Sequence, residues 1–292
     1  MKILALDIGG TNTKIALANK NGNFEKGYPV VEKTKPPIEN FLSEIFEKYL
    51  NNAEKIGISI ASNVNSKGVV VNSTNLEIPK NFPLKEFVER KTGKECRVIN
   101  DGNASAIAVS NIDEFKQFKN IVSVTLGTGI GGGIILNGKV LTSKTGLDSE
   151  IGHITIVPNG KRCNCGNYGC VEAYCGERGI VERFNEKSEK EIENTLELKK
   201  LLEKNDRIAR DIVIETGNYL GLALAIITNI LGIEAFALGG GVCGLGGLLI
   251  ETIKSYLRKN CFGSKIGIFP DVKVIKEYQY LSLKGAAELF NE

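Results

Sequence analysis

One short pattern near the start of this chain, ILALDIGGTNTKIALA at residues 3–18, decides the fold. It consists of an apolar run that ends at Asp7, the glycine-rich bend Gly9-Gly10-Thr11, and a second apolar run. The turn signal Asn21-Gly22 follows. Two short apolar segments joined by glycines and closed by an Asn-Gly pair are typical of a β-hairpin. The pattern therefore predicts a hairpin whose bend is unusually rich in glycine.

The same pattern recurs further along the chain. Residues 121–126 read as a strand, residues 127–133 as a glycine-rich bend, and residues 134–136 as the returning strand, closed by Asn137-Gly138. Repetition of strand, Gly-Thr bend, strand and Asn-Gly turn is most simply explained by duplication of one structural unit. We therefore expect an α/β fold of two related domains that face each other across a cleft.

The rest of the chain alternates between strand-like and helix-like segments. Strands are expected at 56–60, 68–71, 97–99, 235–238 and 272–275, and helices at 41–50, 84–91, 104–109, 180–204, 207–231 and 281–290, with a loop-rich segment at 141–176. We place a domain boundary near Asn111. The expected domains are a smaller one of residues 1–111, completed by a C-terminal helix at about 281–292, and a larger one of residues 112–280.

The composition excludes several classes of protein. Of the 292 residues, 42% are hydrophobic and 24% charged, which argues against disordered, collagen-like and coiled-coil chains. A formal charge of +3 is too weak to indicate a nucleic-acid or membrane partner. The apolar run at the start is too short for an export signal, and the run at 220–227 is too short to span a bilayer. We expect a cytoplasmic protein whose seven cysteines serve as thiols or metal ligands.

Three glycine clusters are candidate nucleotide-binding loops. Glycine permits close backbone approach, so its N–H groups can point at phosphate oxygens. The bend at Gly9, Gly10 and Thr11 adds a hydroxyl, and Asp7 adds a carboxylate that can hold hydrated Mg2+. The remaining candidates are Gly127, Thr128 and Gly129 in the second bend, and Gly240 and Gly241 after the strand at 235–238. Each cluster on its own also fits a tight turn, and none matches the P-loop or Rossmann pattern.

The one histidine and three crowded cysteines indicate a metal site. His153 is followed ten residues later by Cys163, Cys165 and Cys170. Three thiolates and one imidazole complete the tetrahedral ligand set of a structural Zn2+ ion, with no open position. The alternative is a set of buried thiols beside an unrelated histidine. Buried core positions suit Cys96, Cys243 and Cys261, and Cys175 is surplus to a four-ligand site.

Three acidic residues are candidates for contact with a substrate. Asp101 follows an apolar strand, and phosphoryl transfer to an alcohol needs a carboxylate that orients the hydroxyl and accepts its proton. A helix N-cap explains Asp101 equally well. Glu150 lies three residues before His153, and Glu172 lies two after Cys170, so both are expected beside the metal loop, where fixed carboxylates suit recognition of sugar hydroxyls.

Taken in order, these motifs resemble those of the ROK family, named for repressors, open reading frames and kinases, and in particular its sugar kinases. The matching segments are Asp7-Ile8-Gly9-Gly10-Thr11, Asn100-Asp101, the bend 126–133, Glu150-Ile151-Gly152-His153 and the cysteine signature 163–172. The resemblance runs from Met1 to about Val242.

The resemblance implies a two-domain actin/hexokinase-like (ribonuclease H-like) fold, and transfer of the γ-phosphoryl group from ATP, with Mg2+, to a hexose hydroxyl. It implies that Asp101 is the catalytic base and lies at the sugar. Asn100, Glu150, His153 and Glu172 are implied to bond sugar hydroxyls, with His153 also a ligand of Zn2+. The protein is expected to form a homodimer or higher homo-oligomer.

Two departures from the family pattern leave the sugar open. Ala61-Ser62 stands where the family often has Pro-Gly, and Asp148-Ser149 precedes Glu150 where the family has small residues. Glucose is the first candidate, with fructose, mannose, N-acetylmannosamine and N-acetylglucosamine as alternatives. A non-catalytic sugar-binding regulator is the rival interpretation. Repressors of the family carry a DNA-binding segment ahead of this region, and a first strand at Ile3 leaves no room for one. The intact Asp101 argues against a scaffold.

Overall fold

The computed structural model describes residues 1–74 and 76–291, and it contains two compact units. The first unit comprises Met1–Gln117, Gly133–Ser149 and Gln279–Glu292, and the second comprises Phe118–Gly132 and Glu150–Tyr278. The expected domains, 1–111 with about 281–292 and 112–280, stay a prediction, and Glu292 at the end of that range lies outside the described residues.

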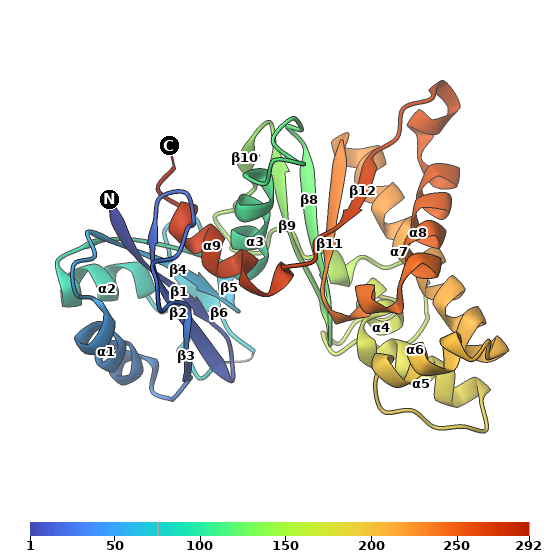
Figure 1. Ribbon diagram of the computed structural model, residues 1–292, viewed down its shortest axis with the longest axis horizontal. Coiled ribbons are helices and arrows are strands. Elements are labelled where there is room, and N and C mark those ends of the chain that lie inside the picture. Colours follow the sequence, from blue (N-terminus) through green and yellow to red (C-terminus); the bar gives the residue numbers. More distant parts are fainter. Residues whose placement is uncertain (75, 292) are drawn as a thin grey trace. The chain divides into compact units, whose positions relative to one another are not determined.

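A five-stranded sheet forms the centre of the first unit, in the order β3-β2-β1-β4-β7 (Figure 1). Its strands are β1 (Lys2–Ile8), β2 (Asn12–Asn19), β3 (Val30–Lys33), β4 (Lys55–Ile60) and β7 (Glu95–Asn100). β1 and β2 pair antiparallel, which confirms the predicted hairpin, whereas β1, β4 and β7 run parallel. Because Ile8 pairs with Ile60 and Ile60 with Asn100, these three strands end side by side at one edge of the sheet.

Helices cover both faces of this sheet, as Figure 1 shows. α1 (Ile38–Tyr49) and α2 (Leu84–Thr92) bury large apolar side chains such as Phe41 and Leu84 against Leu4 and Leu6 of β1. Full burial of each such side chain contributes about 1.5–3 kcal/mol. α3 (Asp101–Ser110) follows β7 directly. A separate two-stranded sheet pairs β5 (Asn63–Val64) with β6 (Val70–Asn72).

The last helix, α9 (Leu281–Glu288), packs on the opposite face of the sheet, where the side chains are small. Ala5, Ala16 and Ala18 are buried there against Leu283, Ala286 and Ala287 of the helix. A Cβ atom at Gly57 of β4 would lie 1.9 Å from the carbonyl oxygen of Ala286, and one at Gly285 would lie 1.8 Å from that of Ala104 in α3. Glycine therefore lets α9 touch both β4 and α3.

The second five-stranded sheet has the order β10-β9-β8-β11-β12. Its strands are β8 (Ile121–Leu126), β9 (Ile130–Leu136), β10 (Lys139–Val140), β11 (Ala235–Gly239) and β12 (Asp271–Val274). β9 begins at Ile130, so the predicted bend of residues 127–133 is wrong in length and covers only residues 127–129. Gly132 and Gly133 lie within β9, and glycine suits these positions because a Cβ atom would lie 2.6 Å from the oxygen of Ser123 and 2.3 Å from that of Gly102.

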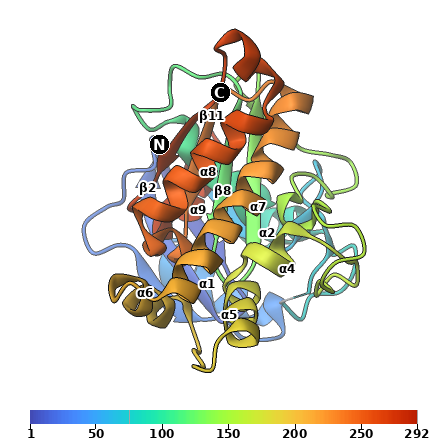
Figure 2. The ribbon, with the colours of Figure 1, turned by 90° about the vertical axis from the view of Figure 1, so that its right-hand side faces the viewer.

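Two long helices of the second unit, α7 (Arg207–Leu231) and α8 (Gly247–Asn260), lie side by side in front of β8 and β11 (Figure 2). They approach closely, because a Cβ atom at Gly217 would lie 2.6 Å from the Cβ of Thr252. By length and composition α7 could cross a membrane, although its apolar run at 220–227 had been expected to be too short. Since 56% of its most apolar window is buried inside the protein, it is better described as a core helix.

The remaining elements of the second unit are short. α5 (Glu177–Lys187) and α6 (Thr195–Glu203) replace the single helical stretch expected at 180–204, because Asn194 caps a new helix by accepting a hydrogen bond from the Glu197 N–H. α4 (Val171–Cys175) lies inside the segment expected to be loop-rich. Short 3-10 turns occupy Ile151–His153, Gly241–Leu245, Phe262–Ile266 and Tyr278–Tyr280.

Candidate active site

The first glycine bend lies at the aligned strand ends of the first unit. The Gly9 N–H donates to the oxygen of Asn12 at 3.0 Å, and the Thr34 hydroxyl donates to the Gly9 oxygen at 2.8 Å, so the bend is held from two sides. Asp7 is only 8% exposed and accepts bonds from Lys14 Nζ at 3.0 Å and Ser59 Oγ at 3.1 Å. Sequence reasoning had not singled out Lys14 and Ser59, which lie within β2 and β4, or Thr34, which follows β3.

Asp101 is the first residue of α3, beside the end of β7. The cap of this helix is Asn100, whose Oδ1 accepts bonds from the N–H groups of Gly102 at 2.9 Å and Asn103 at 3.3 Å. Asp101 Oδ1 accepts from the Gly102 N–H at 2.9 Å and from Asn100 Nδ2 at 3.0 Å. Burial, and then the nearby charge of Asp7, raise the pKa of Asp101 to about 6. A carboxylate with a pKa close to neutral is suited to accept a proton from a substrate hydroxyl.

The two residues that depart from the family pattern before Glu150 have structural roles in the first unit. Asn103, 1% exposed, donates from Nδ2 to Asp148 Oδ2 at 2.7 Å. Asp148 Oδ1 in turn accepts from the N–H and hydroxyl of Ser143 at 3.0 and 2.8 Å. Ser149 has a φ of +63°, a left-handed conformation that glycine adopts more readily. Asp148 therefore ties α3 to the chain segment that leads to Glu150.

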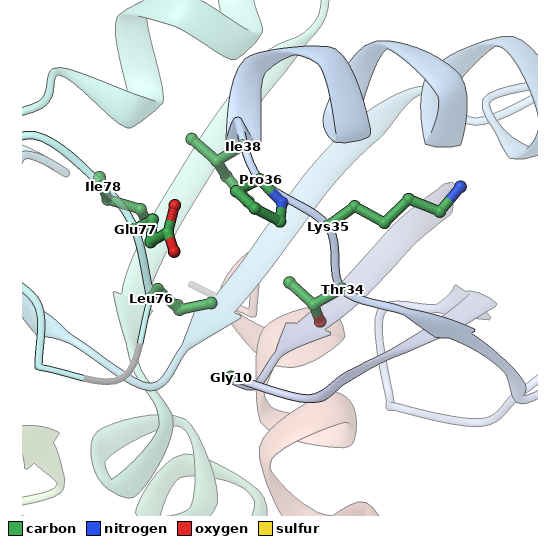
Figure 3. Close-up of a pocket in the computed structure, with 8 residues that line it drawn as sticks. All are labelled: Gly10, Thr34, Lys35, Pro36, Ile38, Leu76, Glu77 and Ile78. Carbon is green, nitrogen blue, oxygen red and sulfur yellow. The ribbon is translucent and has the colours of Figure 1, made fainter.

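A small pocket borders the first bend at Gly10. Figure 3 shows Leu76 and Glu77 facing Thr34 and Pro36 across it, and its volume is about 120 Å³. Typical ligand sites enclose about 300–1,000 Å³, so this pocket alone is too small for a nucleotide or a sugar complex. It marks open space next to the bend that sequence reasoning did not find.

A larger cavity of about 700 Å³ also lies in the first unit, along β7 and the outer side of α3. Its walls include Arg97, Asn111, Lys139 and Glu288. None of the predicted site residues lines it. The larger cavity therefore lies apart from the glycine bend and Asp101. We place the candidate site at the bend and Asp101, because those residues carry the groups that the reaction needs.

The second glycine bend has a similar environment in the second unit. It follows β8, and because Thr125 pairs with Gly239 of β11, the glycines after β11 lie beside it. Gly240 has a φ of +104°, and a Cβ atom there would lie 2.1 Å from the oxygen of Leu126. The structure thus brings the Gly127–Gly129 bend next to the Gly239–Gly241 cluster, as a nucleotide site built from both requires.

The predicted metal ligands lie together. One donor atom each from His153, Cys163, Cys165 and Cys170 falls within 4.8 Å of all the others. The sulfurs of Cys165 and Cys170 are 3.8 Å apart, as are Cys163 Sγ and His153 Nδ1. A tetrahedron with Zn–S bonds of about 2.3 Å has edges of about 3.8 Å, so the donor set fits Zn2+. Burial, followed by the other two thiols, raises the pKa of Cys170 to about 12, and a bound metal must displace that proton.

The two predicted sugar-binding glutamates flank this cluster. Glu150 Oε2 lies 3.9 Å from His153 Nε2, on the side of the ring that faces away from the cysteines. Glu172 Oε1 lies 3.6 Å from Cys163 Sγ, and its Oε2 accepts a bond of 3.0 Å from the Ile130 N–H. Nothing in the sequence predicted the bond between Glu172 and Ile130, the residue that follows the glycine bend.

Comparison with known proteins identifies the family. The ROK family profile matches residues 3–292. An N-acetylmannosamine kinase of Haemophilus influenzae is 31% identical over 266 residues, 88% of this chain and 86% of that protein. A glucokinase of Thermotoga maritima is 28% identical over 315 residues, 100% and 98% of the two chains. The crystal structure of a ROK family glucokinase from Streptomyces griseus, in complex with glucose and AMPPNP, superposes with a TM-score of 0.80 at 27% identity and covers 99% of each chain.

These matches, which cover nearly the whole chain, confirm the expected fold and family. The α/β architecture is the actin/hexokinase-like fold of the ROK sugar kinases. The chain belongs to the ROK family.

Proposed function

We propose that this chain is an ATP-dependent hexose kinase, with glucose as the first candidate acceptor. The observation that carries the proposal is the position of Asp101. Its carboxylate has a pKa raised to about 6, and it follows a strand that ends side by side with the strand bearing the first glycine bend. An ionised carboxylate at that strand edge can orient a hydroxyl and take its proton as the phosphoryl group is transferred.

The first unit contributes the base and one phosphate-binding bend. The Gly10 N–H and the hydroxyl of Thr11 bond phosphate oxygens, and Gly9, whose N–H is bonded to the Asn12 oxygen, allows their close approach. Asp7 holds the hydrated Mg2+ ion, which neutralises phosphate charge when bound. The hydrogen bond from Lys14 Nζ orients the Asp7 carboxylate.

The second unit contributes a second phosphate-binding bend, sugar contacts and a structural metal. Gly127, Thr128 and Gly129 bond phosphate oxygens, and Gly240 and Gly241 let the nucleotide lie against the backbone. Glu150, His153 and Glu172 bond sugar hydroxyls. Zn2+ bound by His153, Cys163, Cys165 and Cys170 has no open coordination position, so it orders the loop and takes no part in the reaction.

N-acetylmannosamine is the second candidate acceptor, because a relative of that activity is 31% identical to this chain. Glucokinases among the relatives favour glucose. Asp148 and Ser149 lie immediately before Glu150, so they are the residues most able to alter the fit of a sugar at that glutamate. We further propose that the enzyme works in the cytoplasm as a homodimer or higher homo-oligomer.

A coupled assay of ADP release over glucose, mannose, fructose, N-acetylmannosamine and N-acetylglucosamine tests the proposal. We expect ATP-dependent turnover with at least one hexose, and the highest kcat/KM with glucose. Asp101→Asn, which keeps the oxygen that accepts from the Gly102 N–H, is the matched control and should turn over at least about 100-fold more slowly. Tight sugar binding without turnover on any of the five would contradict the kinase and favour a sugar-binding regulator.

A further inference from the structure

The short helix α4 joins the Cys/His cluster to the second glycine bend, and all three lie inside the second unit. Cys170, one of the four cluster residues, immediately precedes the helix as its N-cap, and Glu172 lies in the first turn. The Glu172 carboxylate touches both neighbours. Its Oε1 lies 3.6 Å from Cys163 Sγ, and its Oε2 accepts the Ile130 N–H at 3.0 Å. One side chain thus connects the metal loop with the bend.

The bend is fitted closely against this helix. A Cβ atom at Gly129 would lie 2.5 Å from Glu172 Oε2, so only glycine leaves the carboxylate its place. The Glu177 N–H, just after α4, donates to the Gly127 oxygen at 2.9 Å. The bend is therefore bonded at both ends, Gly127 and Ile130, to one helical corner of residues 172–177.

The far end of α4 is anchored too. The Tyr174 hydroxyl accepts the Lys161 N–H at 2.8 Å, which returns the helix to the loop that carries the cysteines. The Tyr174 carbonyl accepts from Arg183 Nη2 at 2.8 Å. Arg183 is only 4% exposed and also pairs with Glu215 at 3.0 Å. α4 is thus hydrogen-bonded both to the loop that carries the cysteines and to Arg183 of α5.

We propose that Glu172 is a positioning residue that couples the metal loop to nucleotide binding, so that Zn2+ in the Cys/His cluster tightens the binding of nucleotide at Gly127–Gly129. The inference rests on the proposed function, because it takes that bend as a phosphate site. Without the metal, the residues around Cys170 lose their common partner and α4 loses its fixed start. The bend must then be ordered by the nucleotide itself, which weakens binding. Coupling of this kind is reciprocal, so nucleotide also tightens metal binding by the same factor.

The test measures nucleotide affinity by calorimetry, with a non-hydrolysable ATP analogue and no sugar, so that any sugar contact of Glu172 does not enter. Zinc-loaded and chelator-stripped wild type are compared, and we expect stripping to weaken binding by about fivefold or more. Glu172→Ala should still bind zinc, as elemental analysis would show. Its nucleotide affinity should depend much less on zinc than that of the wild type. Glu172→Gln keeps a carbonyl oxygen that accepts the Ile130 N–H, so it should preserve most of that dependence.

Where stripping unfolds the protein, as circular dichroism would show, chelator competition supplies the readout. Saturating nucleotide should raise the zinc affinity of the wild type by about fivefold or more, and that of Glu172→Ala by clearly less. If the Ala variant does not retain zinc, Glu172→Asp takes its place, because it keeps the charge but withdraws the carboxylate by one methylene.

Two results would overturn the coupling. The first is that nucleotide affinity does not depend on zinc in the wild type. The second is that it depends on zinc as strongly in Glu172→Ala, or in Glu172→Asp where that variant replaces it, as in the wild type. Failure of the proposed function looks different, since zinc-loaded wild type would then bind no nucleotide at all.

Discussion

The side-chain amide of Asn103, buried in the first turn of α3, donates a hydrogen bond of 2.7 Å to the carboxylate of Asp148. The bond spans 45 positions of sequence and joins the helix that begins with Asp101 to the segment before Glu150. It also explains how an acidic residue is accommodated at this position, since the carboxylate meets three donors from Asn103 and Ser143.

Replacement of Asp148 by alanine should therefore lower the free energy of unfolding by about 2 kcal/mol, because the buried Asn103 amide loses a charged acceptor. Urea unfolding measures the change. Asp113→Ala, which removes an exposed pair with Lys116, is the matched control and should cost clearly less. Equal effects of the two substitutions would show that the Asn103–Asp148 bond contributes little.

Asp101→Asn should reduce kcat by about 100-fold to 10,000-fold or more, because the amide cannot accept the hydroxyl proton. The variant keeps the oxygen that bonds the Gly102 N–H, so sugar affinity should stay within about tenfold of wild type. Steady-state kinetics and sugar titration measure the two effects separately. A large loss of sugar binding would mean that Asp101 serves the structure instead of the reaction.

Glu288 in α9 should make the protein less stable as the pH rises. Burial is the main cause that raises its pKa from 4.5 to about 7, despite a 2.8 Å bond from Asn111 Nδ2. Between those pH values the unfolded chain has released the proton that the folded protein still holds, so the free energy of unfolding falls with rising pH. Glu288→Gln keeps an acceptor for Asn111 and removes this fall.

The Glu288→Gln variant should match wild type near pH 4.5 and exceed it by roughly 1–3 kcal/mol at pH 8. Urea unfolding at the two pH values gives the comparison, and Glu47→Gln on the exposed side of α1 is the control. If the free energy of unfolding changed with pH in the same way in the wild type and in the variant, Glu288 would not be the cause of the pH dependence.

Cys165→Ser should release the metal, because it removes one of four ligands that lie within 4.8 Å of one another. The loss of affinity should exceed the roughly 10–100-fold that changes outside the ligand shell cost. Elemental analysis of purified protein measures zinc per chain. Cys243→Ser, outside the cluster, should leave zinc stoichiometric, and a wild type without metal would refute the zinc site.

Sequence patterns predicted the features that depend on residues close together in the chain. The hairpin of β1 and β2, the long helix α7, and the grouping of His153 with its three cysteines all follow from short spacings in the sequence. The predicted length of the second bend was wrong because glycine can mark a turn or can allow close packing within a strand. At Gly132 and Gly133 it permits contact with Ser123 and Gly102 within and beside a strand, and does not mark a turn.

The missed features depend on partners that are distant in sequence. α4 has five residues, too few for an apolar period, and is fixed by Tyr174 contacts to Lys161 and Arg183. The cap at Asn100 and the bond between Glu172 and Ile130 also required coordinates, because several acceptors stand close together in sequence and only geometry distinguishes them. α8 was not expected at all, although it packs closely against α7 at Gly217.

The packing of α9 against β1 and β4 affects how the protein folds during synthesis. The alanine face of the first strands is buried against Leu283, Ala286 and Ala287, which a ribosome adds long after those strands. The first unit therefore cannot complete its core until residues 281–288 have been made, and this face stays partly open to water until then. A chain truncated before α9 would leave that face partly uncovered, whereas a circular permutant that moves residues 279–291 ahead of Met1 would let the first unit close early.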